Sequence, residues 1–134
     1  MEEKHVVTCF LEYEGKILLL KRSSQVSSYQ YKWAGISGYI EPENTPLKQA
    51  EIELYEETGL KNEEVELIKE GDPIPVIDEK MQRKWIVHPF HFRLLKLKKL
   101  KLDWEHTEFR WMLPEQMLKL STVPGLYEAW ERVK

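Results

Sequence analysis

The apolar residues of this chain fall in short runs of the kind that form β-strands. The runs are rich in β-branched, aliphatic or aromatic residues, and turn-forming residues separate them. They predict strands at Val6–Glu12, Ile17–Leu20, Trp33–Ile40, Val65–Ile68, Trp85–Leu95 and Phe109–Leu113. Because Glu14-Gly15-Lys16 lies between the first two runs, those two strands are expected to form a β-hairpin.

Helical signals are clearest between Thr45 and Gly59. Thr45 can cap a helix, Pro46 suits its first position, and Gly59 can end it. The apolar residues expected on its buried side are Leu47, Ala50 and Leu54, with Ile52 and Tyr55 as further candidates. Two more helices are expected at Pro114–Leu120 and Val123–Val133.

The remaining segments are predicted to be loops. Residues 22–32 are polar and rich in serine, and residues 71–75 read Gly-Asp-Pro-Ile-Pro, which indicates a turn. Lys96–Leu102 alternates imperfectly and fits either a strand end or a loop, and its lysines are typical of a solvated edge. The element order β-β-β-α-β-β-β-α-α predicts an α/β fold with a mixed sheet flanked by helices.

Composition narrows the classes of protein that this chain can be. With 134 residues, 42% of them hydrophobic and 32% charged, it is expected to form a single domain over residues 1–134. The net charge of −3 is spread along the chain, so there is no strong signal for nucleic-acid binding. Cys9 is the only cysteine, which excludes an internal disulfide and a cysteine zinc site, and we expect it to be a small core residue.

Two further observations concern location. Residues 1–5 lack the apolar stretch of a signal peptide, and no run of about 18 apolar residues could span a membrane. We therefore expect a cytoplasmic protein.

The most informative chemistry lies at the end of the helix predicted after Thr45. Glu53, Glu56 and Glu57 stand at positions i, i+3 and i+4, which share one face of a helix. Three like charges on one face destabilise a helix unless a cation neutralises them. Since carboxylate oxygens suit hard divalent ions such as Mg²⁺, the spacing indicates a metal site, although a solvated acidic face is the alternative.

The segment from Gly38 to Leu60 resembles the signature of the Nudix (MutT-like) hydrolases. That signature reads Gly, five residues, Glu, seven residues, then Arg-Glu-aliphatic-x-Glu-Glu-x-Gly-aliphatic. The positions of this chain that match it are Gly38, Glu53, Leu54, Glu56, Glu57, Gly59 and Leu60. Two positions depart, because Asn44 stands in place of the glutamate and Ile52 in place of the arginine. The segments 32–41 and 104–108 also resemble an uncharacterised group of archaeal Nudix domains.

This resemblance implies a fold and a reaction. The fold would be the Nudix α/β/α sandwich, and the reaction would be hydrolysis of a pyrophosphate bond in a nucleoside diphosphate linked to another group, X. The cofactor would be Mg²⁺ or Mn²⁺, held by the Gly38 carbonyl oxygen and by Glu53, Glu56 and Glu57. A homodimer is plausible on the same ground.

Glu105 is a further candidate ligand and catalytic residue. Family members often place a distal glutamate in the loop a few residues before a tryptophan such as Trp111, and Glu105 has that position. Glu53 and Glu105 are the leading candidates for the general base, and Glu57 is expected to be essential for turnover. An ordinary surface ion pair of Glu105 is the alternative.

The departures leave two functions open. Arginine at position 52 would pair with and orient the glutamates, and Ile52 cannot do so. Asn44 loses a charge for which Glu41 or Glu43 could compensate. We favour an enzyme, with activity that these changes could attenuate, over a weakened Nudix-fold module that binds a nucleotide or a protein partner.

Candidate substrate contacts precede the helix. Arg22 could bind phosphates or lie solvated, and Trp33, Tyr29 and Tyr31 could stack on a nucleobase. For Trp33, packing in the core is the more common role. His88 and His91 are three residues apart on a predicted strand, so they should face opposite sides of the sheet and not form a metal pair.

Overall fold

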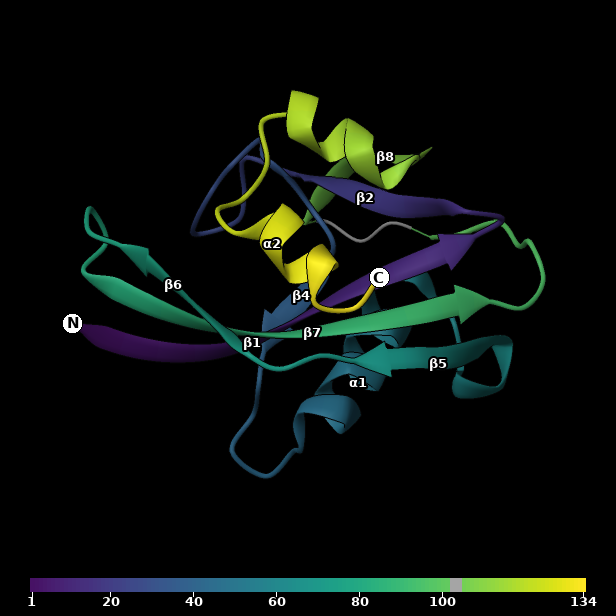
Figure 1. The fold of residues 1–134 in the computed structure, drawn as a ribbon, viewed down its shortest axis with the longest axis horizontal. Helices are drawn as coiled ribbons and strands as arrows, with labels where there is room; N and C mark the ends of the chain where they lie inside the picture. Colours follow the sequence, from purple (N-terminus) through teal and green to yellow (C-terminus); the bar gives the residue numbers. More distant parts are fainter. Residues whose placement is uncertain (102–104) are drawn as a thin grey trace.

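The computed structural model describes residues 1–101 and 105–134 as a sheet with helices on its two faces (Figure 1). The described strands are β1 (Glu2–Tyr13), β2 (Lys16–Arg22), β3 (Trp33–Ala34), β4 (Ile36–Tyr39), β5 (Val65–Glu70), β6 (Ile74–Asp78), β7 (Arg83–Leu94) and β8 (His106–Met112). The helices are α1 (Pro46–Thr58), α2 (Leu126–Glu131) and the 3₁₀ helices η1 (Asn62–Glu64) and η2 (Pro114–Lys119).

Strand β1 lies near the centre of this mixed sheet. The strand order is β3-β2-β1-β7-β5, with β4 paired to β1, β6 to β7 and β8 to β2. The pairing of β1 with β7 is parallel from Glu2↔Arg83 to Glu12↔Arg93, whereas the other pairings among the described strands are antiparallel. The predicted hairpin of β1 and β2 is confirmed by the pairs Glu12↔Ile17 and Tyr13↔Lys16.

Alternation along the central strands produces one apolar core on each face of the sheet. The core under α1 contains Val7, Cys9, Leu11, Leu18, Leu20, Ile36, Ala50, Leu54, Leu60, Phe90, Phe92, Leu94 and Leu100. The core under α2 contains Phe10, Ile17, Leu19, Trp33, Ile74, Trp85, Val87, Met112, Met117, Leu126, Ala129, Trp130 and Val133. Successive strand residues point to opposite faces, so each central strand contributes to both cores. The predicted α/β/α arrangement is confirmed.

Helix α1 begins and ends where its sequence predicts. The Thr45 hydroxyl accepts a hydrogen bond from the Lys48 backbone N–H at 3.1 Å, and Pro46 occupies the first turn. Gly59 has φ +79°, the left-handed conformation that glycine adopts without strain, and its N–H donates to the Tyr55 carbonyl at 2.8 Å. These two caps fix the segment that carries the three glutamates.

Strand β6 is the main element that the sequence does not predict. Its first two residues, Ile74 and Pro75, lie in the segment predicted to be a turn, and the strand pairs with β7 from Ile74↔Val87 to Asp78↔Arg83. Proline cannot donate to a sheet ladder, which is why Gly-Asp-Pro-Ile-Pro indicates a turn, but a strand at a sheet edge tolerates it. Here Ile74 is buried in the core under α2, and this burial outweighs the local turn signal.

The C-terminal helices are shorter than predicted. Residues 114–119 form a 3₁₀ helix, and α2 starts at Leu126 and not at Val123. The Val123 N–H donates to the Trp33 carbonyl at 2.9 Å, and Gly125 has φ +77°, so the chain turns before the helix begins. Residues 96–101 form no strand, while Leu102 of the same segment lies outside the described residues. Within the described ranges, no helix is long and apolar enough to cross a membrane.

Candidate functional site

The backbone of Gly38 lies directly against the carboxylate of Glu53. Gly38 is in β4 and Glu53 is in the middle of α1, and these two elements pack together. A Cβ atom built on Gly38 would overlap the Glu53 carboxylate. A residue with a side chain therefore cannot occupy position 38 unless Glu53 moves, which explains why the motif has glycine here. The structure thus brings together the first glycine of the motif and the first of its three matching glutamates.

Glu53 is half-buried, and polar groups on two sides hold its carboxylate. Gln49, one helical turn earlier, donates from Nε2 to Glu53 Oε1 at 3.1 Å. Burial raises the pKa of the Glu53 carboxyl to about 7, and the negative charges of Glu56 and Glu105 add to this rise. Hydrogen bonds with Glu57 and Gln49 act in the opposite direction. The carboxyl of Glu53 therefore exchanges its proton near neutral pH.

Glu57 is a buried carboxylate beside a buried imidazole. Glu57 is 2% exposed, and His106 Nε2 lies 3.3 Å from Glu57 Oε1. His106 comes from the start of β8, directly after Glu105. A carboxylate is costly to bury unless other groups compensate its charge, so the burial of Glu57, near the C-terminal end of α1, depends on neighbours such as His106.

Glu56 and Glu105 surround these two carboxylates. Glu56 is exposed on α1, and Glu105 is half-buried in the turn directly before β8. The influence of both charges on the pKa of Glu53 shows that they are electrostatic neighbours of the same carboxyl. The other three glutamates predicted as ligands or catalytic residues, Glu56, Glu57 and Glu105, thus all act on the carboxyl of Glu53. Asp103 and Trp104, which precede Glu105, lie outside the described residues.

The donor set suits a hard divalent cation in an open site. In residues 1–101 and 105–134, no group of three or more His, Cys, Asp or Glu side chains could hold a metal ion, so the protein alone does not enclose one. Mg²⁺ does not require such an enclosure, because it keeps several waters and is usually bound by one or two carboxylates together with substrate phosphates. Burial is the main cause of the raised pKa of Glu53, the charges of Glu56 and Glu105 add to it, and a cation beside this carboxyl would stabilise its ionised form. The residues present therefore fit Mg²⁺ or Mn²⁺.

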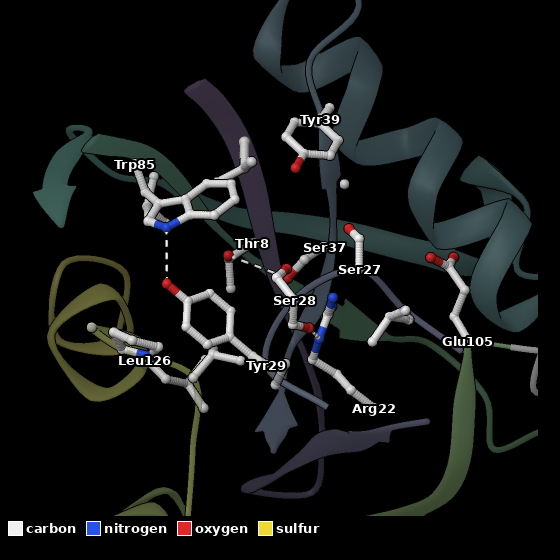
Figure 2. Close-up of a pocket in the computed structure, with 18 of the residues that line it drawn as sticks. Thr8, Arg22, Ser27, Ser28, Tyr29, Ser37, Tyr39, Trp85, Glu105 and Leu126 are labelled. Atoms are coloured by element: carbon white, nitrogen blue, oxygen red, sulfur yellow. Dashed lines mark hydrogen bonds between the residues drawn. The ribbon is translucent and has the colours of Figure 1, made fainter. Parts of the chain in front are cut away.

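A cavity of about 350 Å³ opens beside this carboxylate cluster. Figure 2 shows Glu105 at the side of the cavity next to the helix, with Tyr29 and Trp85 at the opposite side. Its walls come from six separate regions of the chain: β1, residues 22–29, residues 34–39, β7, Glu105 and residues 123–129. Most of the lining is apolar or uncharged, and Arg22 and Glu105 are its charged residues. The geometry suits a flat, largely uncharged group with an ionic group at the mouth.

Tyr29 forms the far wall of the cavity in a strained conformation. Its φ of +51° lies in the left-handed region, which costs of order 1 kcal/mol or more for a residue of this kind. Its hydroxyl donates to Asp78 Oδ2 at 2.5 Å and accepts from Trp85 Nε1 at 3.0 Å. These two bonds connect the loop to β6 and β7 and fix the two aromatic rings at the cavity.

Arg22 enters the cavity from the end of β2. Its Nε donates to the Ser28 carbonyl at 3.0 Å, which holds the guanidinium against the loop. Burial lowers the pKa of Arg22, and the nearby carboxylates of Glu105 and Glu57 act against that lowering. An arginine remains charged under these conditions, so Arg22 presents a fixed positive charge between the glutamates and the apolar part of the cavity.

The other two predicted substrate contacts lie elsewhere. Trp33 is 6% exposed, belongs to the core under α2, and has the Arg110 guanidinium 5.1 Å from its ring centre. Its position corresponds to the core-packing alternative. Tyr31 is 59% exposed and is not among the residues that line the cavity. The structure therefore brings Arg22, but neither Trp33 nor Tyr31, to the cavity.

The two strand histidines face opposite sides of the sheet, as predicted. His88 Nε2 lies 3.0 Å from His5 Nδ1, whereas His91 bonds to Glu12 Oε1 and to the Val133 carbonyl at 2.9 Å each. Each histidine therefore has a different set of partners, and they do not form a metal pair with each other.

Sequence reasoning did not identify Gln49, Trp85 or Tyr39 as site residues. Gln49 precedes Glu53 by four positions, and this helical spacing could have revealed it. Trp85 and Tyr39, whose ring centres are 6.0 Å apart, come from different strands, and the sequence holds no local signal for their meeting. The half-buried Asn44 contacts Gln49, while the side chains of Glu41 and Glu43 are exposed.

Comparisons with known proteins agree with this geometry. A family model described as the NUDIX domain matches residues 2–132. The solved structure of a MutT protein from Methanosarcina mazei Go1 is 26% identical, with a TM-score of 0.77, and the match covers 98% of this chain and 93% of that chain. The E. coli ORF135 protein is 25% identical, with a TM-score of 0.73 and coverage of 98% and 90%.

A third similar structure has a lower sequence identity. The E. coli dihydroneopterin triphosphate pyrophosphohydrolase is 16% identical, with a TM-score of 0.79 and coverage of 98% of this chain and 96% of that chain, and this likeness shows the fold alone. Among the curated proteins, no sequence matches the chain. Because the family model matches nearly all of its residues, the chain belongs to the Nudix family.

Proposed function

We propose that this protein is a divalent-metal-dependent hydrolase that cleaves a pyrophosphate bond in a nucleoside diphosphate linked to another group. The observation that carries the proposal is the carboxylate cluster of Glu53, Glu57 and Glu105 at the side of a largely apolar cavity. Membership of the Nudix family supports it. The cavity would take the base or another flat group, and the cluster would face the phosphates.

Each charged residue has a distinct part in this proposal. Glu53, Glu56, Glu57 and Glu105, with the Gly38 carbonyl, would hold Mg²⁺ or Mn²⁺. The bound cation would neutralise phosphate oxygens and lower the pKa of a water molecule. Arg22, held at the Ser28 carbonyl, would bind a phosphate oxygen through its free N–H groups.

Two carboxylates are the candidates for accepting the proton of the attacking water. Without a metal ion, burial raises the pKa of the Glu53 carboxyl to about 7, so Glu53 could act as the base only where it does not coordinate the cation, whereas Glu105 lies at the side of the cavity. Replacing either by glutamine keeps the shape and removes the proton acceptor. The acid limb of the pH–rate profile should disappear in the variant that lacks the general base.

Turnover on a panel of compounds tests the proposal. Nucleoside triphosphates, dinucleoside polyphosphates, ADP-ribose and sugar nucleotides would be incubated with Mg²⁺ or Mn²⁺, and the products separated by chromatography. We expect cleavage of at least one compound, and we expect Glu57→Gln to abolish it. Glu63→Gln is the matched control, because Glu63 is an exposed glutamate in η1, outside the carboxylate cluster.

The competing function is a nucleotide-binding or partner-binding module with weakened catalysis. The departures at Asn44 and Ile52 favour that function. Tight binding of a nucleotide without cleavage of any compound in the panel would support it and would overturn the enzyme proposal. The homodimer that the family resemblance makes plausible is independent of this choice, and light scattering in solution would test it by measuring the molecular mass.

A further inference from the structure

The side chain of Gln49 connects the loop before α1 to the carboxylate of Glu53. Gln49 is 3% exposed, although glutamine is ordinarily a surface residue. Its Nε2 donates to Glu53 Oε1 at 3.1 Å, and its Oε1 accepts from Asn44 Nδ2 at 2.9 Å and from the Glu41 backbone N–H at 3.1 Å. Three hydrogen bonds therefore converge on one buried amide.

The orientation of this amide is fixed by the backbone. The N–H of Glu41 can only donate, so the Gln49 atom that faces it must be the oxygen. The amide nitrogen is then forced to point along the helix toward Glu53. A flipped amide would set two donors against each other at Glu41 and two acceptors against each other at Glu53, and it would lose both bonds.

Asn44 strengthens the same orientation. Its Nδ2 donates to the oxygen that already receives the Glu41 N–H, and its own backbone N–H donates to the Glu41 carbonyl at 3.0 Å. The short turn 41–44 is thereby held in one shape, with two donors directed at Gln49. A glutamate at position 44 would bring acceptor oxygens to this point and could not make that contact in its ionised form.

Glu53 receives no comparable support from a cation. Among the described residues, no lysine or arginine forms an ion pair with Glu53, and position 52 is a half-buried isoleucine. Its carboxylate also lies against the Gly38 backbone, so a small rotation would move it away from the place where the cavity and the other glutamates meet.

We propose that Gln49 is a positioning residue, which Asn44 and the Glu41 backbone hold in place and which aims the Glu53 carboxylate at the metal-binding position. This inference rests on the proposed function, because it assumes that Glu53 is a metal ligand. The polar contacts of the turn 41–44 then supply, by a neutral hydrogen-bonded chain, the orientation that Ile52 cannot provide.

Metal affinity measured directly tests the proposal. The free Mn²⁺ signal in electron paramagnetic resonance gives the dissociation constant without any substrate. Loss of a group that orients a metal ligand typically weakens binding by about 10- to 100-fold, and we expect Gln49→Leu to fall in that range. Asn44→Ala, at a half-buried position, is the second variant, and a smaller loss of several-fold is expected because the Glu41 N–H still holds the amide oxygen.

Thr45→Ala is the matched structural control. It removes the cap of the same helix and so lowers stability, and it leaves the side-chain contacts of Gln49 intact. We expect its Mn²⁺ affinity to match that of the wild type. With a substrate that the protein cleaves, Gln49→Leu should raise the metal concentration needed for half-maximal rate. Its KM for the nucleotide should stay within about twofold of the wild-type value.

The outcomes separate this inference from the proposed function. If Gln49→Leu and Asn44→Ala fold and bind Mn²⁺ as the wild type does, the positioning role is overturned while the enzyme proposal stands. If Thr45→Ala weakens Mn²⁺ binding as much as Gln49→Leu, the effect is merely structural, and the inference is overturned. If the wild type binds no Mn²⁺, both proposals are overturned.

Discussion

Replacing Gly38 by alanine should separate the stability of this protein from its metal affinity. The added Cβ would overlap the Glu53 carboxylate, whose end is the flexible part of that side chain. Ordinary van der Waals contact begins at 3.4 Å, so the carboxylate has to move by more than about 1 Å. Moving it breaks the hydrogen bond from Gln49, which is worth about 1 kcal/mol, and the fold itself need not shift.

The effect on metal binding should be much larger than the effect on stability. Mg²⁺ holds its ligands at about 2.0–2.1 Å in near-ideal octahedral geometry, so a carboxylate displaced by about 1 Å is lost as a ligand. We expect the affinity for Mn²⁺ to fall by at least about tenfold, while the free energy of unfolding falls by only about 1–2 kcal/mol. Electron paramagnetic resonance and chemical denaturation measure the two quantities on the same samples.

A second glycine provides the matched control. Gly15 lies in the β1–β2 turn with φ +82° and open space around its Cα, so alanine there introduces backbone strain away from the carboxylates. Gly15→Ala should lose a similar amount of stability and keep its Mn²⁺ affinity. The reasoning is refuted if Gly38→Ala binds Mn²⁺ within twofold of the wild type, because Glu53 would then not need its present position.

Three further predictions follow from the charges and the cavity. Arg22→Gln should raise the KM for a nucleotide substrate about tenfold or more with a smaller change in kcat, because under the proposed function the guanidinium would bind phosphate in the ground state as well as in the transition state. Steady-state kinetics test this, and an unchanged KM would exclude the role. The raised pKa of Glu53, about 7 in the folded state against 4.5 ordinarily, means that the metal-free protein loses stability as pH rises between these values. Added Mg²⁺ should therefore raise the Tm more at pH 8 than at pH 6, and an equal rise would contradict that pKa. Tyr29→Phe removes the bonds to Asp78 and Trp85, so it should cost about 1–2 kcal/mol of stability and weaken nucleotide binding, as denaturation and calorimetry would measure; unchanged binding would mean that the tyrosine does not shape the cavity.

Local chemistry predicts the helix of the site well. Thr45 and Gly59 specify the two ends of α1 through a cap and a left-handed turn, and both features depend on neighbouring residues alone. The approach of Gly38 to Glu53 also follows from the motif, because the family resemblance places the two residues at one metal site. For these features the sequence contains nearly all the information that the structure later displays.

The cavity and strand β6 depend on contacts between distant segments. Ile74 and Pro75 indicate a turn locally, and they form a strand because β7 offers an unpaired edge and the core under α2 buries Ile74. Trp85 and Leu126 meet at the cavity although 41 positions separate them, and Trp33, which looks equally suitable for stacking, is used in the core. Aromatic type alone does not reveal which side of the sheet a residue will face.

The central claim is that a divalent cation binds at Gly38, Glu53 and Glu57. Substoichiometric Mn²⁺ added to ¹⁵N-labelled protein broadens the amide signals that lie close to the bound ion, so NMR can locate the site without a substrate. We predict selective broadening at Gly38, in the last two turns of α1 and at Glu105, and its loss in Glu53→Gln. Broadening centred instead on the exposed pair of His5 and His88, or none at these glutamates, would contradict the claim.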